Sequence, residues 1–274
     1  MSFKRSFILL LSVVLFCSAF LFACKEDSQT TETTVTTTTQ PATTEAVSTV
    51  PATTEAETPP VIVVLDAGHD TDKHTRNQPQ LGFNEQDLNF KITMACFERL
   101  SEYEGVEIHL TRTGGECPNA DGKYEDCIMA RTKVATKVGA DMFVSFHCNA
   151  TTGSLGASAN GACVFVSKHP DYYDESAELG NLILTNLCCA VDIANDGVMT
   201  RSKPEKGYYP NGTVKDWYYL ISNNIDDGQP SVIIEHAFMD NSHDNAILKD
   251  DENLKKMGIA DADAIAQYFD LELK

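Results

Sequence analysis

The sequence predicts an α/β fold with three layers, in which a mostly parallel twisted sheet is flanked by helices. Two kinds of segment carry this prediction. VIVVL (61–65) and PSVIIE (230–235) are continuous apolar runs, which are typical of parallel strands buried on both faces. Between them, apolar residues recur at helical spacing, as in 86–103. Strands that alternate with helices favour a largely parallel sheet covered on both faces.

The expected elements follow one another along the chain. VEIHL alternates apolar and polar residues, as a strand does, and Gly139 is typical of the residue that ends a helix. The expected strands are 61–65, 106–110, 141–146, 161–167 and 230–235. The expected helices are 86–103, 125–139, 175–190 and 252–269. Ligands of such sheets bind beyond the carboxyl ends of the strands, so polar residues after these strands are candidates for a functional site.

Residues 1–23 have the pattern of a lipoprotein signal peptide. Lys4 and Arg5 precede an apolar core at 7–15 that is short for a membrane span. The sequence LFAC is similar to the bacterial lipobox, so we expect lipidation at Cys24. The alternatives are ordinary secretory cleavage nearby and an uncleaved anchor. Each version places the protein outside the cytoplasm, and lipidation would make it a membrane-anchored lipoprotein at the cell envelope.

Residues 24–60 differ in composition from the rest of the chain. Thr, Pro, Ala and Glu dominate, and PATTEA occurs at both 41–46 and 51–56. Such a segment cannot bury enough apolar surface to offset the entropy of ordering it. We therefore predict a disordered stalk at 24–60 that gives a tethered domain its reach, and a single folded domain at 61–274.

The chain is acidic, with 40 Asp and Glu residues against 21 Lys and Arg residues and a formal net charge of −19. This balance argues against a nucleic-acid partner and against electrostatic docking on anionic lipid. We therefore expect contact with a membrane through the lipid anchor only, and we expect a monomer.

Seven of the nine cysteines lie in the folded domain, and no CxxC pair has the spacing of a zinc ribbon. Cys117 and Cys127 flank a polar loop and are candidates for a disulfide. We expect most of the others to behave as small buried hydrophobic residues and none to be a nucleophile.

Four polar residues at the ends of expected elements carry the functional prediction: His69, Glu85, His147 and Glu235. Two imidazoles and one carboxylate can hold Zn²⁺ and leave a position free for water. A further carboxylate can then act as the general base. The set predicts a zinc amide hydrolase in which the two histidines and one of the two carboxylates bind the metal and the other carboxylate is the base.

The remaining histidines are better explained as hydrogen-bonded structural residues: His74, His109, His169, His236 and His243. His236 would point away from Glu235 in an extended chain, although it could orient the site from behind. Asp66 is either another such orienting group or a cap of the turn that follows the first strand.

Several motifs occur in the order found in one enzyme family: LDAGHD (65–70), GFNEQDLN (82–89), LTR (110–112), RTKVATKVGADMFVSFHCNA (131–150), GACVFV (161–166) and PSVIIEHAFMDN (230–241). In this order they resemble the zinc-dependent N-acetylmuramoyl-L-alanine amidases of the type-3 family, which are bacterial cell-wall hydrolases. The resemblance covers essentially the whole of 61–271.

The resemblance implies a zinc exopeptidase/amidase-like fold for 61–274 and a role for each of the four residues. His69, Glu85 and His147 match the family's Zn²⁺ ligands, and Glu235 matches its catalytic base. The implied substrate is peptidoglycan, cut between N-acetylmuramic acid and the L-alanine of the stem peptide in wall remodelling or turnover.

One segment has no clear counterpart in these motifs. Residues 201–229 are rich in Tyr and contain Trp217. The aromatic side chains could stack on sugar or line a peptide groove, or they could simply pack onto the sheet.

Two other classes of function stay open. A secreted zinc carboxypeptidase or other exopeptidase would share this style of site. A lipoprotein that binds peptidoglycan without cutting it is the second alternative, against which the presence of all ligands and the base argues.

Overall fold

The computed structural model describes residues 59–119 and 123–274. Its main sheet contains the strands β1 (Val61–Ala67), β4 (Val106–Leu110), β5 (Met142–Asn149), β6 (Ala162–Val166), β7 (Asn195–Thr200) and β8 (Ser231–Phe238). Their spatial order is β4-β1-β5-β8-β6-β7. The first four strands in this order are parallel, whereas β6 runs antiparallel to β8 and β7 runs parallel to β6.

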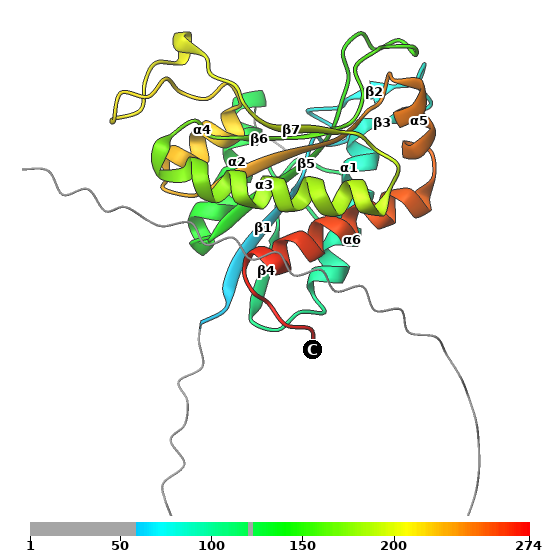
Figure 1. Ribbon diagram of the computed structural model, residues 1–274. Coiled ribbons are helices and arrows are strands. Elements are labelled where there is room, and N and C mark those ends of the chain that lie inside the picture. The colour runs from blue at the N-terminus through cyan, green and yellow to red at the C-terminus, as the bar shows by residue number, and fades with distance from the viewer. Residues whose placement is uncertain (1–58, 120–122) are drawn as a thin grey trace, which may run out of the picture. The chain divides into compact units, whose positions relative to one another are not determined.

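Helices cover both faces of this sheet. The helices α1 (Glu85–Leu100), α3 (Pro170–Ala190) and α6 (Asp251–Tyr268) cover one face, where α6 contacts both α1 and α3; α3 and α6 lie in front in Figure 1. The helices α2 (Tyr124–Val138) and α4 (Tyr219–Asp226) contact each other and lie over β1 and β8 on the other face. Four short elements complete the described chain: β2 (Asn77–Gln78), β3 (Phe83–Asn84), η1 (Pro204–Lys206) and α5 (Ser242–Leu248).

The sheet separates two hydrophobic cores. Val63 packs toward the larger core, which includes side chains of α1, α3 and α6, whereas its neighbour Val64 packs toward the smaller core with side chains of α2 and α4. On β5, Val144 likewise packs toward the larger core and its neighbour Phe143 toward the smaller core. Because successive side chains of a strand point to opposite faces, a strand covered on both sides needs an uninterrupted apolar run.

The fold class predicted from the sequence is confirmed, and the differences lie at the periphery. Strand β7 was not predicted because NDGVMT is polar and contains glycine, as suits the sheet edge that it occupies. Helix α3 begins at Pro170, where the side chain of His169 accepts a hydrogen bond from the Asp171 N–H and proline suits the first turn. Helices α4 and α5 are too short to show a clear helical period.

The expectations about the front of the chain concern residues outside the described part. The signal peptide, Cys24 and almost all of the stalk belong to residues 1–58 and remain predictions. Within the described residues, no helix has both the length and the apolar character needed to cross a membrane.

Cys117 and Cys127 form a disulfide, and five other cysteines in the described residues are free. Burial raises the pKa of Cys96 and Cys148 well above the ordinary value and that of Cys163 to about 12. Thiols with so high a pKa stay protonated at neutral pH, which disfavours nucleophilic attack by these three cysteines. Cys188 is half-buried and Cys189 is exposed, whereas the other three free cysteines are buried, in agreement with the expectation that most are buried.

Candidate active site

The site lies where β1, β5 and β8 end side by side. His69 follows β1, while His147 lies on β5 opposite Glu235 on β8 in the parallel register. Glu85 is the first residue of α1 and is buried. Three neighbouring strands and one helix N-terminus therefore bring all four predicted residues to one edge of the sheet, which is the edge where ligands of parallel sheets bind.

Three of these side chains converge on one point. The Nε2 atom of His69 lies 3.1 Å from Oε1 of Glu85, and Nδ1 of His147 lies 3.2 Å from the same oxygen. One nitrogen or oxygen atom from each of the three residues lies within 4.8 Å of the others. Two imidazole nitrogens and a carboxylate oxygen are a donor set that Zn²⁺ prefers, so the residues present fit that ion.

The charge states also match metal binding. Burial would raise the pKa of Glu85, but the neighbouring imidazoles of His69 and His147 outweigh it and hold the pKa well below its ordinary value. Burial lowers the pKa of His147, against the pull of Glu85. An ionised carboxylate and a neutral imidazole are the forms that coordinate a cation, so neither group has to lose a proton at neutral pH.

Glu235 differs from Glu85 in having no ion-pair partner among the described residues. Its Oε2 atom is shielded from solvent and makes no hydrogen bond with the described residues. Burial, together with the negative charge of Glu85, raises its pKa well above the ordinary value, and Arg76 opposes this only in part. A carboxyl group in this state is available to exchange a proton with a substrate in the cleft.

Comparison with known proteins assigns this site to a family. Residues 63–267 match the model of the N-acetylmuramoyl-L-alanine amidase family, described as Amidase_3. The chain belongs to the Amidase_3 family. It is therefore an amidase of peptidoglycan, a hydrolase, as the sequence motifs predicted.

Individual relatives agree with this assignment. An endolysin of Bacillus phage SPP1 is 27% identical over 213 residues, which cover 78% of this chain and 68% of the endolysin. The CwlD amidase of Clostridioides difficile, solved in complex with the GerS lipoprotein, superposes with a TM-score of 0.61 at 26% identity and covers 77% of this chain and 98% of CwlD. The amidase AmiC2 of Nostoc punctiforme gives a TM-score of 0.57 at 26% identity, with 77% and 97% coverage.

The amidase fixes the backbone around its first histidine in a strained form. His69 has a φ of 59°, in the left-handed region that non-glycine residues rarely adopt. Gly68 is needed beside it, because a Cβ atom there would lie 2.3 Å from Cε1 of His147. The Arg131 guanidinium donates a hydrogen bond of 2.7 Å to the carbonyl of His69 and holds the turn in place. The close approach of the two histidines therefore depends on a glycine and on an arginine from α2.

The same arginine belongs to a buried network below the site. Arg131 is paired with Asp66 at 2.7 Å, and both side chains are almost fully buried. Asp66 also accepts hydrogen bonds from the hydroxyls of Thr111 and Ser145, both at 2.6 Å. Arg112 donates to the carbonyls of Ala67 and Gln86 at 2.9 Å and so joins the end of β1 to α1. These bonds bind β1, β5 and two helices to one another.

Asp66 therefore does more than cap the turn, although it touches no predicted metal ligand directly. The Arg131 guanidinium and the two hydroxyls outweigh the effect of burial and lower the pKa of Asp66. Sequence reasoning missed Arg112 and Arg131 as site-building residues. Both lie inside the family motifs, but an arginine in the middle of a helix or shortly after a strand follows no spacing rule that would have singled it out.

His236 supports the second histidine from behind. Its Nδ1 atom lies 3.0 Å from the carbonyl oxygen of His147, and its Nε2 atom lies 2.9 Å from Oδ2 of Asp261 on α6. Both side chains of this pair are fully buried. His236 points away from Glu235 along the strand, as alternation predicted, and it fixes the backbone that carries His147.

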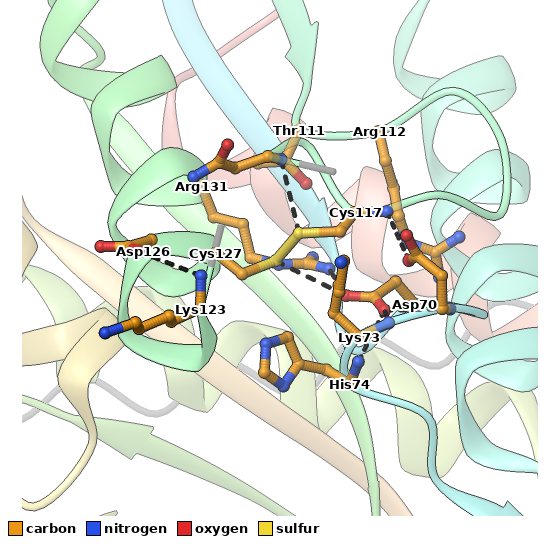
Figure 2. The surroundings of a disulfide bond; sticks show 12 residues. Asp70, Lys73, His74, Thr111, Arg112, Cys117, Lys123, Asp126, Cys127 and Arg131 are labelled. Carbon is orange, nitrogen blue, oxygen red and sulfur yellow. Dashed lines mark hydrogen bonds and ion pairs between the residues drawn. A yellow bond between two sulfur atoms is a disulfide. The ribbon is translucent and has the colours of Figure 1, made fainter. Parts of the chain in front are cut away.

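The disulfide lies beside the strained turn, as Figure 2 shows. Cys127 Sγ lies 3.6 Å from a carboxylate oxygen of Asp70, which is also within 3.4 Å of Arg131. The other oxygen of Asp70 accepts hydrogen bonds from the backbone N–H groups of Lys73 and His74, at 2.6 and 2.7 Å. The bridge thus joins the loop after β4 and the first turns of α2 to the segment that carries His69.

A cavity of about 500 Å³ opens above these residues. Its lining includes His69, His147 and Glu235 and, on one side, side chains from 201–219. The four predicted residues therefore form the floor of a cleft, and a segment without an assigned role forms one wall.

Proposed function

We propose that this amidase is a zinc-dependent enzyme that hydrolyses the bond between N-acetylmuramic acid and the L-alanine of the stem peptide, in wall remodelling or turnover. One observation carries the proposal. Three ligand atoms of His69, Glu85 and His147 converge at the floor of a cleft that also contains the unpartnered carboxyl of Glu235. This arrangement supplies both a site for the metal and a group that can transfer a proton.

His69, Glu85 and His147 would hold the ion, which when bound polarises the scissile carbonyl and lowers the pKa of water to about 7. Glu235 takes a proton from the attacking water on a carboxylate oxygen. It then delivers that proton to the nitrogen of the leaving alanine, so that the amine departs neutral. The buried bonds of Arg131 and His236 to backbone carbonyls keep the two histidines oriented while this happens.

We further propose that lipidation at Cys24 anchors the enzyme to the outer face of the membrane and that residues 24–60 give it reach into the wall. The lipobox-like LFAC sequence and the Thr/Pro/Glu-rich composition support this placement. Peptidoglycan is then the partner, the membrane is touched only through the lipid, and the protein acts as a monomer without nucleic acid.

The experiment compares the full-length protein with its Glu235→Gln variant on purified sacculi. The wild type should release intact stem peptides, identified by mass. The variant should keep its zinc, measured by elemental analysis, but lose roughly 100- to 10,000-fold in rate, as is usual when a general base is removed. Glu178→Gln, which removes an exposed carboxylate of α3, is the matched control and should be as active as the wild type.

Two results would count against the proposal. Undiminished hydrolysis by the Glu235→Gln variant would show that this carboxylate is not the base. Products with shortened stems still attached to glycan would identify a peptidase, and binding to sacculi without any product would identify a binding protein.

A further inference from the structure

The wall of the amidase cleft has the opposite charge from the chain as a whole. The protein carries a formal net charge of −19, yet Arg201, Lys203 and Lys206 line the same cavity as the catalytic floor. These cations follow β7 in a single short segment. A cluster of like charges at the mouth of a cleft in an acidic protein favours an anionic ligand there.

The segment that carries the cations is a closed hairpin, residues 201–217, and extends as the yellow loop beyond β7 in Figure 1. Its two arms meet in isolated β-bridges between Ser202 and Asp216 and between Tyr208 and Val214. Asp216 is buried and accepts hydrogen bonds from the hydroxyls of Ser167 at 2.6 Å and Tyr209 at 2.7 Å. These bonds fasten the 201–217 hairpin to the end of β6 and so fix the position of the hairpin's own side chains.

Aromatic rings, not carboxylates, hold the three cations. The guanidinium carbon of Arg201 lies 4.3 Å from the centroid of the Trp217 ring, and Nζ of Lys203 lies 4.5 Å from it. Nζ of Lys206 lies 3.3 Å from the ring centroid of Tyr219 and donates a hydrogen bond to the carbonyl of Trp217. An aromatic face attracts a cation but leaves its charge uncompensated.

Lys215 of the same hairpin also lies over an aromatic ring, that of Tyr209, but unlike the cleft-facing cations it has a carboxylate partner. Lys215 forms an ion pair with Asp226, whereas no described carboxylate forms an ion pair with Arg201, Lys203 or Lys206. The cleft-facing cations are therefore positioned and unneutralised, which is the state that a site for an anion requires.

The electrostatics of Lys206 agree with this interpretation. Partial burial, followed by the positive charges of Lys203 and Lys215, lowers the pKa of Lys206 to about 8, although Asp216 acts in the opposite direction. The cations repel one another across the cleft wall. A bound anion would relieve that repulsion.

The aromatic residues of this segment differ in what they contact. Tyr218 is half-buried and packs on Phe165, with ring centroids 4.8 Å apart, and it also lines the cavity and is hydrogen-bonded to Arg201. Trp217 and Tyr219 remain 38% and 48% exposed and lie against the cations through their ring faces. Stacking on a neutral sugar would need the rings but not three charges. The cations favour the peptide half of the substrate, because a peptide carries carboxylates.

We propose that Arg201, Lys203 and Lys206 bind a free carboxylate of the stem peptide and so make the amidase selective for stems whose carboxylates are not amidated. This inference rests on the proposed function and adds a specificity site to it. Arg201 can pair with both oxygens of a carboxylate, while the two lysines supply point charges beside it.

The test uses two synthetic N-acetylmuramoyl tetrapeptides of one sequence, with their peptide carboxylates either free or converted to carboxamides. The wild-type full-length protein should prefer the free form by about tenfold in kcat/KM, mainly through KM, which corresponds to about 1.4 kcal/mol. In the variant R201Q/K203Q this ratio should fall to about one, because charge-assisted bonds to the free carboxylate are lost.

The control is Lys255→Gln, which removes one exposed positive charge from α6, away from the cleft, and should keep the tenfold preference. Unchanged thermal midpoints would show that the variants are folded. A wild-type ratio near one, or a ratio that survives in R201Q/K203Q, overturns the inference. The inference also fails if the double variant loses activity only on walls that still carry phosphodiester polymers, because the cations would then serve phosphate.

Binding measurements distinguish a failure of the anion site from a failure of the proposed hydrolysis. Calorimetry with the Glu235→Gln variant measures affinity for both compounds without turnover. If the wild type cuts neither compound but the variant binds the free-carboxylate form more tightly, the proposed function fails and the anion site stands. If the wild type cuts both compounds equally well and the variant binds them equally, the function stands and the anion site fails.

Discussion

The floor and the wall of the cleft are built on different physical principles. On the floor, buried ion pairs and bonds to backbone carbonyls fix the side chains, as Asp66 and Arg131 show. On the wall, exposed or partly buried cations lie over the ring of Trp217 in the 201–217 hairpin and the ring of Tyr219 in α4. Buried bonds are strong and intolerant of change, whereas exposed cation–aromatic contacts contribute only about 0.5–1 kcal/mol each. Substitutions of the floor residues should therefore destabilise the protein strongly, whereas substitutions of the wall residues should change the proposed selectivity with little loss of stability.

The largest effect is expected from breaking the floor at its ligand. Glu85→Gln should weaken zinc binding by more than about 100-fold, since even residues that only orient ligands are worth 10- to 100-fold. Activity should fall with it. Zinc content after dialysis measures the change, and Glu98→Gln, at an exposed position of the same helix, should retain metal and activity. Full zinc retention in Glu85→Gln would remove this residue from the ligand set.

The network below the floor should matter for stability. Asp66→Asn leaves Arg131 charged and buried, so the free energy of unfolding should fall by about 3–5 kcal/mol in urea titrations. Asp251→Asn, which breaks an exposed pair with Lys91, should cost less than about 1 kcal/mol. Equal losses of unfolding free energy in the two variants would show that the buried pair contributes no more to stability than the exposed pair.

The same carboxylate predicts a pH dependence. Because the folded state lowers the pKa of Asp66, its contribution to stability is complete above the unfolded value of about 4 and is lost as the pH falls through the lower folded value. As the pH falls below about 4, the free energy of unfolding of Asp66→Asn should therefore decrease with a smaller slope than that of the wild type. An unaltered slope in the variant would mean that other carboxylates account for it.

The disulfide beside the strained turn should give a smaller effect. Replacing both Cys117 and Cys127 by serine should lower the free energy of unfolding by about 2–4 kcal/mol, as is typical of a bridge that closes a short loop. A reductant should lower the melting temperature of the wild type but not of the double variant. Cys189→Ser removes an exposed free thiol and should change neither. A wild type insensitive to reductant after full reduction of the bridge would contradict the prediction.

The smallest effect is expected from the cations of the cleft wall, as a change of the substrate preference with pH. The pKa of Lys206 is about 8, so its positive charge is present below that pH and is lost above it. The preference for free over amidated stem carboxylates should therefore decline about two- to threefold between pH 7 and pH 9, as one of three charges is lost. In Lys206→Gln the preference should be lower at pH 7 and flat with pH. A wild-type ratio that rises with pH would contradict this sign.

The sequence by itself determined the layers of the fold and the residues of the floor. Apolar runs long enough to be buried on both faces marked β1, β5 and β8, and the polar residues at their ends then had to meet at one edge. His69, His147 and Glu235 could be named because strand period is a local property of the chain, and Glu85 because the GFNEQDLN motif resembles that of the amidase family.

Only the tertiary structure decided what holds and surrounds those residues. Arg131 reaches Asp66 and the His69 turn across more than sixty positions of the chain, and His236 reaches Asp261 on α6. The 201–217 hairpin faces the floor because Asp216 fastens it to the end of β6. Such contacts join segments that are distant in sequence and follow no period, so packing alone sets them.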